Sequence, residues 1–263
     1  MLLSDVVIRA VIGAVVAAGV AFVSRRARAL STSGAVAAAI VGTLAVAAGW
    51  SWGVLLFSMF VAASALSKAG SRQKAVRLAT IVEKGSERDA YQVLANGGVF
   101  GAAALGQIIT PSPVWLAIAA GAMAASSADT WATEVGTMST VDPISIITGK
   151  KVPPGTSGGI TFAGTAASVV GALFIAAVAA LAAWPTPFAA IAVGGSVGAL
   201  ADSVLGGTLQ ERRWCDLCSK ETERLVHSCG TKTRRVGGLP GLNNDAVNAA
   251  CSGIGALVAL ALS

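Results

Sequence analysis

The chain alternates long runs of apolar residues with short segments that contain charged residues, proline or glycine. A helix needs about 20 consecutive apolar residues to cross the hydrocarbon core of a bilayer. The pattern therefore predicts an all-α, polytopic membrane helix bundle with about seven to nine transmembrane helices. The second, third and fifth runs are short, which makes them candidates for tilted, re-entrant or broken helices. The predicted spans are residues 6–24, 34–49, 51–67, 91–110, 114–130, 159–184, 188–209 and 245–262.

Composition supports this interpretation. Of the 263 residues, 54% are hydrophobic and only 12% are charged, and the mean hydropathy is +0.72. Soluble domains are about 25% charged, so the chain has too few polar residues to form a water-exposed surface. A disordered chain, a coiled coil and a disulfide-rich secreted protein are excluded by the same figures. We interpret residues 1–263 as a single transmembrane domain, with a larger insertion at residues 210–243 before the last helix.

The positive charges predict the orientation of the bundle. All but one of the 19 Lys and Arg residues lie in alternate connections, namely 25–28, 68–88, 150–151 and 212–235. Because basic connections face the cytoplasm, we expect these four connections to lie on that side of the membrane. The net charge of +6 then reflects topology and contact with anionic membrane lipids, and we expect no nucleic-acid partner. Within 68–88, the apolar stripe of Ala75, Leu78, Ala79 and Val82 predicts an interfacial helix.

Carboxylates interrupt the predicted spans, although a charge in the hydrocarbon costs at least ~2.5–3.5 kcal/mol on insertion scales. Asp129 and Glu134 lie at the end of the fifth span, among several hydroxyl residues. On a straight helix, positions five apart differ by about 140° in direction. The two carboxylates can therefore bind one cation only if the helix breaks or if waters intervene. The alternative interpretation is a polar helix end.

Two further polar clusters occur near the C-terminus. One cluster has a four-residue spacing and consists of Gly198, Asp202 and Gly206. The two glycines flank the carboxylate of Asp202, so another helix or a ligand can approach it closely. The alternative is ordinary glycine-mediated packing. The last span opens with several amides and the acid Asp245. Asn244 is the predicted N-cap, and Asp245 and Asn248 project on one side of the helix.

The segment that follows Lys150 and Lys151 is a proline-stiffened, glycine-rich turn that leads into a helix. Its residues are Gly155, Thr156, Ser157, Gly158 and Gly159. Backbone N–H groups in such a turn, together with the positive end of a helix, favour anions such as phosphate. The order of the residues differs from that of a Walker A loop. A plain connecting loop is the alternative.

The insertion carries three of the four cysteines and the only histidine. Cys215, Cys218, His227 and Cys229 form the pattern C-x2-C-x8-H-x-C. A reducing cytoplasm disfavours disulfides, and this spacing is compatible with a tetrahedral Zn²⁺ site that stabilises the loop. Three free thiols and a surface histidine are the alternative. Cys251, in the last span, is interpreted as a small packing residue.

Five strings resemble the phytyl-phosphate kinase family of integral membrane proteins. They are residues 92–98 (QVLANGG), 127–136 (SADTWATEVG), 152–159 (VPPGTSGG), 202–210 (DSVLGGTLQ) and 244–248 (NDAVN). The resemblance implies a kinase that phosphorylates an isoprenyl monophosphate to the diphosphate with a nucleoside triphosphate such as CTP. The string around Asp129 is also similar to the acidic motif of membrane CTP-dependent lipid kinases and cytidylyltransferases, which bind Mg²⁺.

With this resemblance, we expect the polar clusters to form one site. Mg²⁺ on the nucleotide is expected to be held by Asp129, Glu134, Asp202 and Asp245. We expect phosphoryl oxygens to be bound by Lys150, Lys151 and the turn at 155–159. Other groups are expected to contact the prenyl-phosphate substrate, whose tail would lie between the spans; these are Asn96, Ser203, Gln210, Asn244 and Asn248. A nucleotidyl transferase that links CTP to a lipid and a small-molecule transporter are alternatives, and the oligomeric state is left open.

Overall fold

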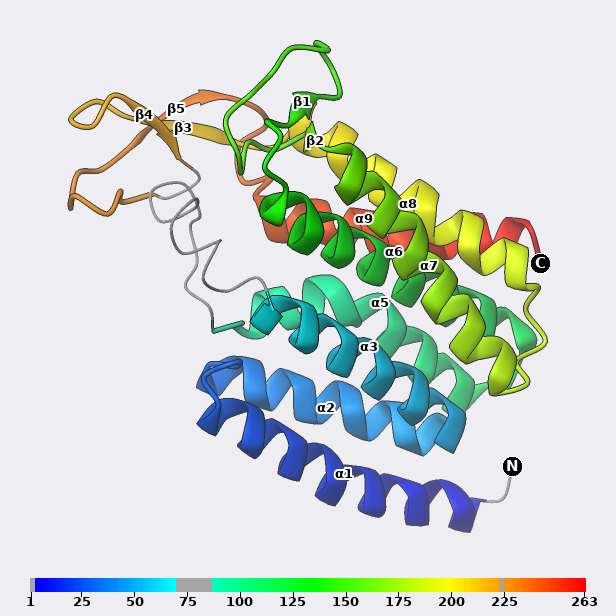
Figure 1. Ribbon diagram of the computed structural model, residues 1–263. Coiled ribbons are helices and arrows are strands. Elements are labelled where there is room, and N and C mark those ends of the chain that lie inside the picture. Colours follow the sequence, from blue (N-terminus) through cyan, green and yellow to red (C-terminus); the bar gives the residue numbers. More distant parts are fainter. Residues whose placement is uncertain (1–2, 70–86, 223–224) are drawn as a thin grey trace.

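The computed structural model describes residues 3–69, 87–222 and 225–263 of the chain. Eight helices pack into a bundle across these residues (Figure 1). The prediction of an all-α membrane bundle is confirmed. The interfacial helix expected at residues 75–82 lies outside the described residues. The helices are α1 (Leu3–Arg26), α2 (Thr32–Ala48), α3 (Trp50–Ala69), α5 (Ala90–Ile109), α6 (Pro113–Met138), α7 (Phe162–Leu181), α8 (Phe188–Thr208) and α9 (Asn244–Ala261).

Most of these helices begin at a short polar side chain that caps the first turn. Such a side chain accepts a hydrogen bond from a backbone N–H that has no partner within the helix. Pro113 follows one of the caps, at the start of α6, where its lack of an N–H costs nothing. The caps are Ser31 for α2, Asp89 for α5, Ser112 for α6, Thr161 for α7 and Asn243 for α9.

Helix α6 lies at the centre of the bundle and packs against α3, α5, α7, α8 and α9. The pair α1 and α2 lies at one side, with α2 packed on α5 (Figure 1). Alanine and glycine fill most of the buried stretch of α6 between Ala117 and Ala128. These small side chains allow close contact with five neighbours. The same hydrophobic core includes an aromatic group in which Trp52 contacts Phe100 and Trp184.

Six helices of the described part are long and apolar enough to cross a membrane: α1, α3, α5, α7, α8 and α9. Helix α2 is apolar but has only 17 residues. The fifth predicted span was expected to be short and to end at residue 130, but α6 continues to Met138 and has 26 residues. The extension packs on α7, since a Cβ at Gly136 would lie 3.3 Å from the hydroxyl of Thr161. The extension is therefore in contact with protein on the side of Gly136.

Two small sheets occupy the connections at one end of the bundle. Strands β1 (Ile144–Ser145) and β2 (Gly159–Ile160) pair antiparallel between α6 and α7. Strands β3 (Arg212–Cys215), β4 (Lys220–Thr222) and β5 (Arg234–Gly237) form an antiparallel sheet in the order β4-β3-β5 between α8 and α9. The α1–α2 connection lies at this same end, whereas both termini lie at the opposite end (Figure 1).

Candidate functional site

Two carboxylates from different helices meet inside the bundle. Asp129 of α6 and Asp202 of α8 share a side-chain hydrogen bond, and both interact electrostatically with Cys251 of α9. Asp202 lies six residues before Thr208, the last residue of α8, which places it ~9 Å from that helix end. Two carboxylates in contact cannot both be ionised unless a cation compensates their charge, so the pair requires a shared proton or a metal ion.

Glycines explain why the three helices approach closely enough for this contact. A Cβ added at Gly198 of α8 would lie 2.5 Å from the Cβ of Ala125 and 2.8 Å from the carbonyl oxygen of Cys251. A Cβ at Gly255 of α9 would also lie 2.5 Å from the Cβ of Ala125. Real Cβ atoms do not tolerate such distances. Helices α6 and α9 therefore approach α8 closely at Gly198, as ordinary glycine-mediated packing, the alternative interpretation, also predicts.

The turn at 155–159 rests on the last two turns of α8. Gly158 has a φ of 76°, and a Cβ there would lie 2.5 Å from the Cα of Gly207 and 2.9 Å from the carbonyl oxygen of Ser203. On the opposite side, the N–H of Ile146 donates to the carbonyl of Gly158 at 2.9 Å. The turn therefore lies about one helical turn beyond Asp202, towards the end of the bundle that carries the sheets.

Other predicted residues also surround this turn. Gln210 is buried. A Cβ added at Gly206 would lie 3.4 Å from the side-chain oxygen Oε1 of Gln210 and 3.4 Å from the backbone N of Gly158. Lys150 and Lys151 are exposed on the connection between β1 and β2, where the carbonyl of Lys150 accepts from the N–H of Ser145. Their role in binding phosphoryl oxygens stays a prediction.

Glu134 does not share the position of Asp129. Helix α6 is unbroken between the two residues, so their side chains leave the axis about 140° apart. The helix break that would let both carboxylates bind one cation directly is absent. Glu134 is buried and lies on the side of α6 nearer to Thr130. Asp202 on α8 supplies the second carboxylate beside Asp129 instead.

A polar network joins α5, α6 and α9 near the carboxylate pair. The hydroxyls of Ser126 and Ser252 are 2.8 Å apart, and that of Ser126 donates to the carbonyl of Asn96 at 2.8 Å. The hydroxyl of Ser252 is also 3.0 Å from the carbonyl of Asn248. The structure therefore connects Asn96 and Asn248, although the two residues are far apart in the sequence. Ser126 and Ser252 were not predicted as site residues.

The start of α9 differs slightly from the prediction. Asn243, not Asn244, is the N-cap, because its side chain accepts from the N–H of Ala246 at 3.0 Å. Asn244 and Asp245 form the first turn of α9, one to two turns from the network at Ser252. This places Asp245 at the same end of the bundle as the 155–159 turn, but on a different helix from the carboxylate pair.

The four predicted Mg²⁺ ligands do not converge as one set. In the part of the chain that the structure describes, the group of Cys215, Cys218, His227 and Cys229 is the one group of three or more potential ligands whose atoms come together. Among the acidic residues, Asp129 and Asp202 share a side-chain hydrogen bond. This still fits Mg²⁺, which proteins usually bind through one or two carboxylates together with substrate phosphates and water.

An apolar cavity of about 210 Å³ lies on the other side of α6. Helices α1, α2, α3 and α5 supply most of its walls. Its polar lining residues gather towards the end with the sheets, so the cavity is apolar along its length and polar at one end. The polar lining residues are Ser24, Arg88, Gln92, Asn96 and Thr130, and the apolar ones include Val16, Val41, Leu56, Phe60 and Met123.

Arg88 is the positively charged residue among those that line this cavity. From the sequence it was predicted only to belong to a basic connection. Its backbone pairs with the α1–α2 connection, where the N–H of Ser31 donates to the carbonyl of Arg88 at 3.0 Å. Burial lowers the pKa of its guanidinium from the ordinary value. Arg88, Gln92 and Asn96 follow one another at intervals of four, and this spacing is the signal that could have revealed one polar face.

The Cys and His residues of the insertion come together as predicted. All four ligand atoms lie within 4.8 Å of one another, with Cys215 and His227 buried and Cys229 exposed. Hydrogen bonds with Thr231 and His227 lower the pKa of the Cys229 thiol to about 6, which favours the thiolate that binds metals. This cluster lies in the sheet β4-β3-β5 and its connections, apart from the carboxylate pair.

Comparison with known proteins confirms the resemblance to a family of integral membrane proteins. The family described as "Integral membrane protein DUF92" matches residues 15–256. The chain is 30% identical to "Protein PGR" of Arabidopsis thaliana over 91% of each chain. It is 29% identical to an uncharacterized membrane protein of Methanocaldococcus jannaschii, over 79% of this chain and 86% of the relative. No solved structure matches the chain.

Proposed function

The chain belongs to the integral membrane protein DUF92 family, and we propose that it is a membrane kinase for isoprenyl monophosphates. A phosphate oxygen of the lipid attacks the γ-phosphorus of a nucleoside triphosphate such as CTP, a new P–O bond forms, and the nucleoside diphosphate leaves. The acceptor phosphate is ionised at neutral pH, so the reaction needs no strong general base. The site must instead hold two anions together in line.

The observation that carries this proposal is the contact between Asp129 and Asp202 beside the turn at 155–159. These two carboxylates are the residues that would hold Mg²⁺. When bound, Mg²⁺ would neutralise charge on the nucleotide phosphates. The turn, packed on Gly207 and the carbonyl of Ser203, would then bind phosphoryl oxygens through its backbone, about one helical turn away.

The apolar cavity supports a lipid as the acceptor. An isoprenyl phosphate has an apolar tail and an anionic head, and the cavity has apolar walls and Arg88 at its polar end. Thr130, which follows Asp129 in α6, lines the polar end of the cavity. This supports a position of the phosphate head at that end, from which it would reach past α6 to the carboxylate pair. Ligand pockets commonly measure about 300–1,000 Å³. A cavity of about 210 Å³ therefore holds only part of a long prenyl chain, and the remainder would extend into the bilayer.

The distribution of charge supports a cytoplasmic site. The basic clusters of the described residues lie in connections at one end of the bundle (Figure 1), and the turn at 155–159 lies at that end. Basic connections face the cytoplasm, which is where nucleoside triphosphates are available. We therefore propose that the site opens to the cytoplasmic leaflet, from which a prenyl phosphate reaches it by lateral diffusion.

Product analysis tests this proposal. The full-length protein in lipid nanodiscs is incubated with Mg²⁺, CTP and geranylgeranyl or phytyl monophosphate, and the products are identified by mass spectrometry. A kinase yields the prenyl diphosphate and CDP. A nucleotide-linked lipid with pyrophosphate would identify a nucleotidyl transferase instead, and no new covalent product with any nucleoside triphosphate would contradict an enzymatic role.

Variants connect the product to the carboxylate pair. Asp129→Asn and Asp202→Asn keep the size of the side chain, remove its charge and replace one acceptor oxygen by an NH2 donor. We expect each to lower kcat by about 10²–10³, the range seen when one preorganised electrostatic group is lost. Asp142→Asn, at an exposed position of the α6–β1 connection, is the matched control and should retain wild-type turnover.

A further inference from the structure

The insertion between α8 and α9 presents a compact group of metal-binding side chains. The sulfur atoms of Cys215 and Cys229 are 3.6 Å apart, and Nδ1 of His227 is 3.2 Å from the sulfur of Cys229. Cys218 hydrogen-bonds with both other cysteines of the group. Zn–S bonds of about 2.3 Å in a tetrahedron place two sulfurs about 3.8 Å apart. The observed distances therefore match the edges of a tetrahedral site with three sulfurs and one nitrogen.

The backbone presents these ligands from two hairpin tips. Cys215 ends β3, and the tight turn that contains Cys218 returns to β4 through Ser219, which has a φ of 51°. His227 and Cys229 lie in a second turn that closes through Gly230, with a φ of 83°. The N–H of Gly230 donates to the carbonyl of His227 at 2.8 Å. Two facing turns of this kind leave the four side chains directed at one point.

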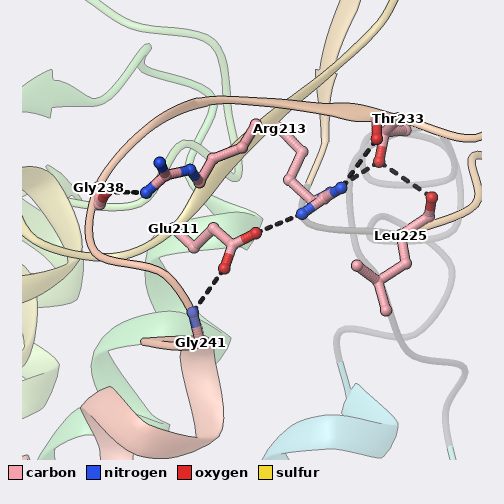
Figure 2. A network of polar contacts seen from close by, with 7 residues as sticks. Glu211, Arg213, Leu225, Thr233, Gly238 and Gly241 are labelled. Atoms are coloured by element: carbon pink, nitrogen blue, oxygen red, sulfur yellow. Dashed lines mark hydrogen bonds and ion pairs between the residues drawn. The ribbon is translucent and has the colours of Figure 1, made fainter.

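Hydrogen bonds connect the second tip to the base of the insertion (Figure 2). The hydroxyl of Thr233 donates to the carbonyl of Leu225 at 3.1 Å, across the arm that carries His227. The guanidinium of Arg213 donates to the hydroxyl and the carbonyl of Thr233, both at 2.8 Å. Another N–H of Arg213 donates to the carboxylate of Glu211, and this ion pair is largely buried.

Glu211 connects this network to the start of α9. Its carboxylate accepts the N–H of Gly241 at 2.7 Å, and its own N–H donates to the carbonyl of Leu242 at 2.8 Å. These bonds hold the connection that ends at the N-cap Asn243. One continuous set of contacts therefore runs from the Cys and His ligands to the first turn of α9, which contains Asp245.

We propose that Cys215, Cys218, His227 and Cys229 bind one structural Zn²⁺, and that this ion holds the start of α9 in place through Arg213 and Glu211. The four ligands complete a closed tetrahedral shell, as in structural zinc sites, so the ion has no open position for catalysis. A sheet of three short strands has little apolar core of its own. The metal supplies the stabilisation that such a core would otherwise provide.

Metal analysis tests the first part. The full-length protein, purified in detergent with Zn²⁺ in the medium, should contain about one zinc per chain. Replacement by Co²⁺ should produce the visible absorption of a tetrahedral thiolate complex. Cys218→Ser and Cys229→Ser should lose the zinc, whereas the control Cys251→Ser should keep it. Wild-type protein without zinc, equal zinc in all variants, or a Cys215–Cys229 disulfide released by reductant but not by chelator would each overturn the proposal.

Hydrogen exchange tests the second part without any measurement of activity, so it stands apart from the proposed kinase function. Removal of zinc from the wild-type protein with a chelator should accelerate exchange of the amides at 239–246 by about tenfold or more. Amides of α2 (Thr32–Ala48), at the far side of the bundle, serve as the internal control and should not change. Exchange at 239–246 that stays constant after the metal is removed would overturn the link to α9.

Discussion

Substitution of Gly158 by alanine should separate the 155–159 turn from α8. The new Cβ would lie 2.5 Å from the Cα of Gly207 and 2.9 Å from the carbonyl of Ser203. Because carbon atoms pack at about 3.5–4.0 Å, the turn must move by ~1 Å. A displacement of this size next to a reacting group costs about 10²-fold in rate. In addition, the φ of 76° costs alanine about 1 kcal/mol of stability relative to glycine.

Gly149→Ala is the matched control. Gly149 belongs to the same connection and also has a positive φ, 68°, but nothing lies within 4 Å of its missing Cβ. It therefore shares the backbone strain of Gly158→Ala and lacks the collision. Steady-state kinetics with CTP and a prenyl monophosphate should show kcat/KM reduced by about 10²-fold for Gly158→Ala and nearly unchanged for Gly149→Ala. Equal losses in the two variants would refute the role assigned to contact with α8.

Two other predictions concern charged groups at the same end of the bundle. Arg88→Gln should raise the KM for prenyl monophosphate about 10–100-fold, since a hydrogen bond to a charged group contributes ~1.5–3 kcal/mol. The KM for CTP should not change, and the exposed Arg25→Gln is the control. The hydrogen bond from Gly241, followed by those from Arg213, lowers the pKa of Glu211 below its ordinary 4.5. The carboxylate therefore stabilises the connection to α9 above pH 4.5, and this stabilisation disappears as the pH falls through the lowered pKa. Protection of the Gly241 amide, expressed relative to its intrinsic exchange rate at each pH, should decrease in acid in the wild type, whereas an identical acid response in Glu211→Gln would contradict this explanation.

Local periodicity was sufficient for some parts of the site. The four-residue repeat of Gly198, Asp202 and Gly206 predicted close approach to α8, because residues four apart lie on one helix face. The structure places α6 and α9 against Gly198 and the 155–159 turn against Gly206. A repeat of this kind involves one helix only, so no knowledge of the partner is needed to recognise it.

The position of Arg88 could not be predicted in this way. Its burial depends on pairing between residue 88 and the α1–α2 connection, where Leu30 bridges to Arg88. These segments are separated in the sequence by α2, α3 and the following connection. The spacing of Arg88, Gln92 and Asn96 indicates one polar helix face, but it does not show which distant segment covers that face. Charge alone indicated only the side of the membrane.

The partner of Asp129 illustrates a similar limit. Glu134 was favoured because it is close in the sequence, yet a continuous helix directs it away from Asp129. Whether α6 would break there depended on packing beyond Thr130, where Gly136 lies against α7. The apolar run stops at this point, but the helix continues to Met138 and packs on the start of α7 at Gly136. The contact with Asp202 follows from that continuity.

The composition of α6 and the position of the carboxylates have one physical cause. A helix surrounded by five others does not need a lipid-facing surface, so it can be rich in alanine and serine and still lie in the bundle. The small side chains from Ala117 to Ala128 let α8 and α9 approach, and the first acid after this stretch, Asp129, shares a hydrogen bond with Asp202. A bulkier α6 would be more apolar and easier to recognise as a span, but it would hold the two carboxylates apart. The small side chains of α6 therefore fit its position at the centre of the proposed active site.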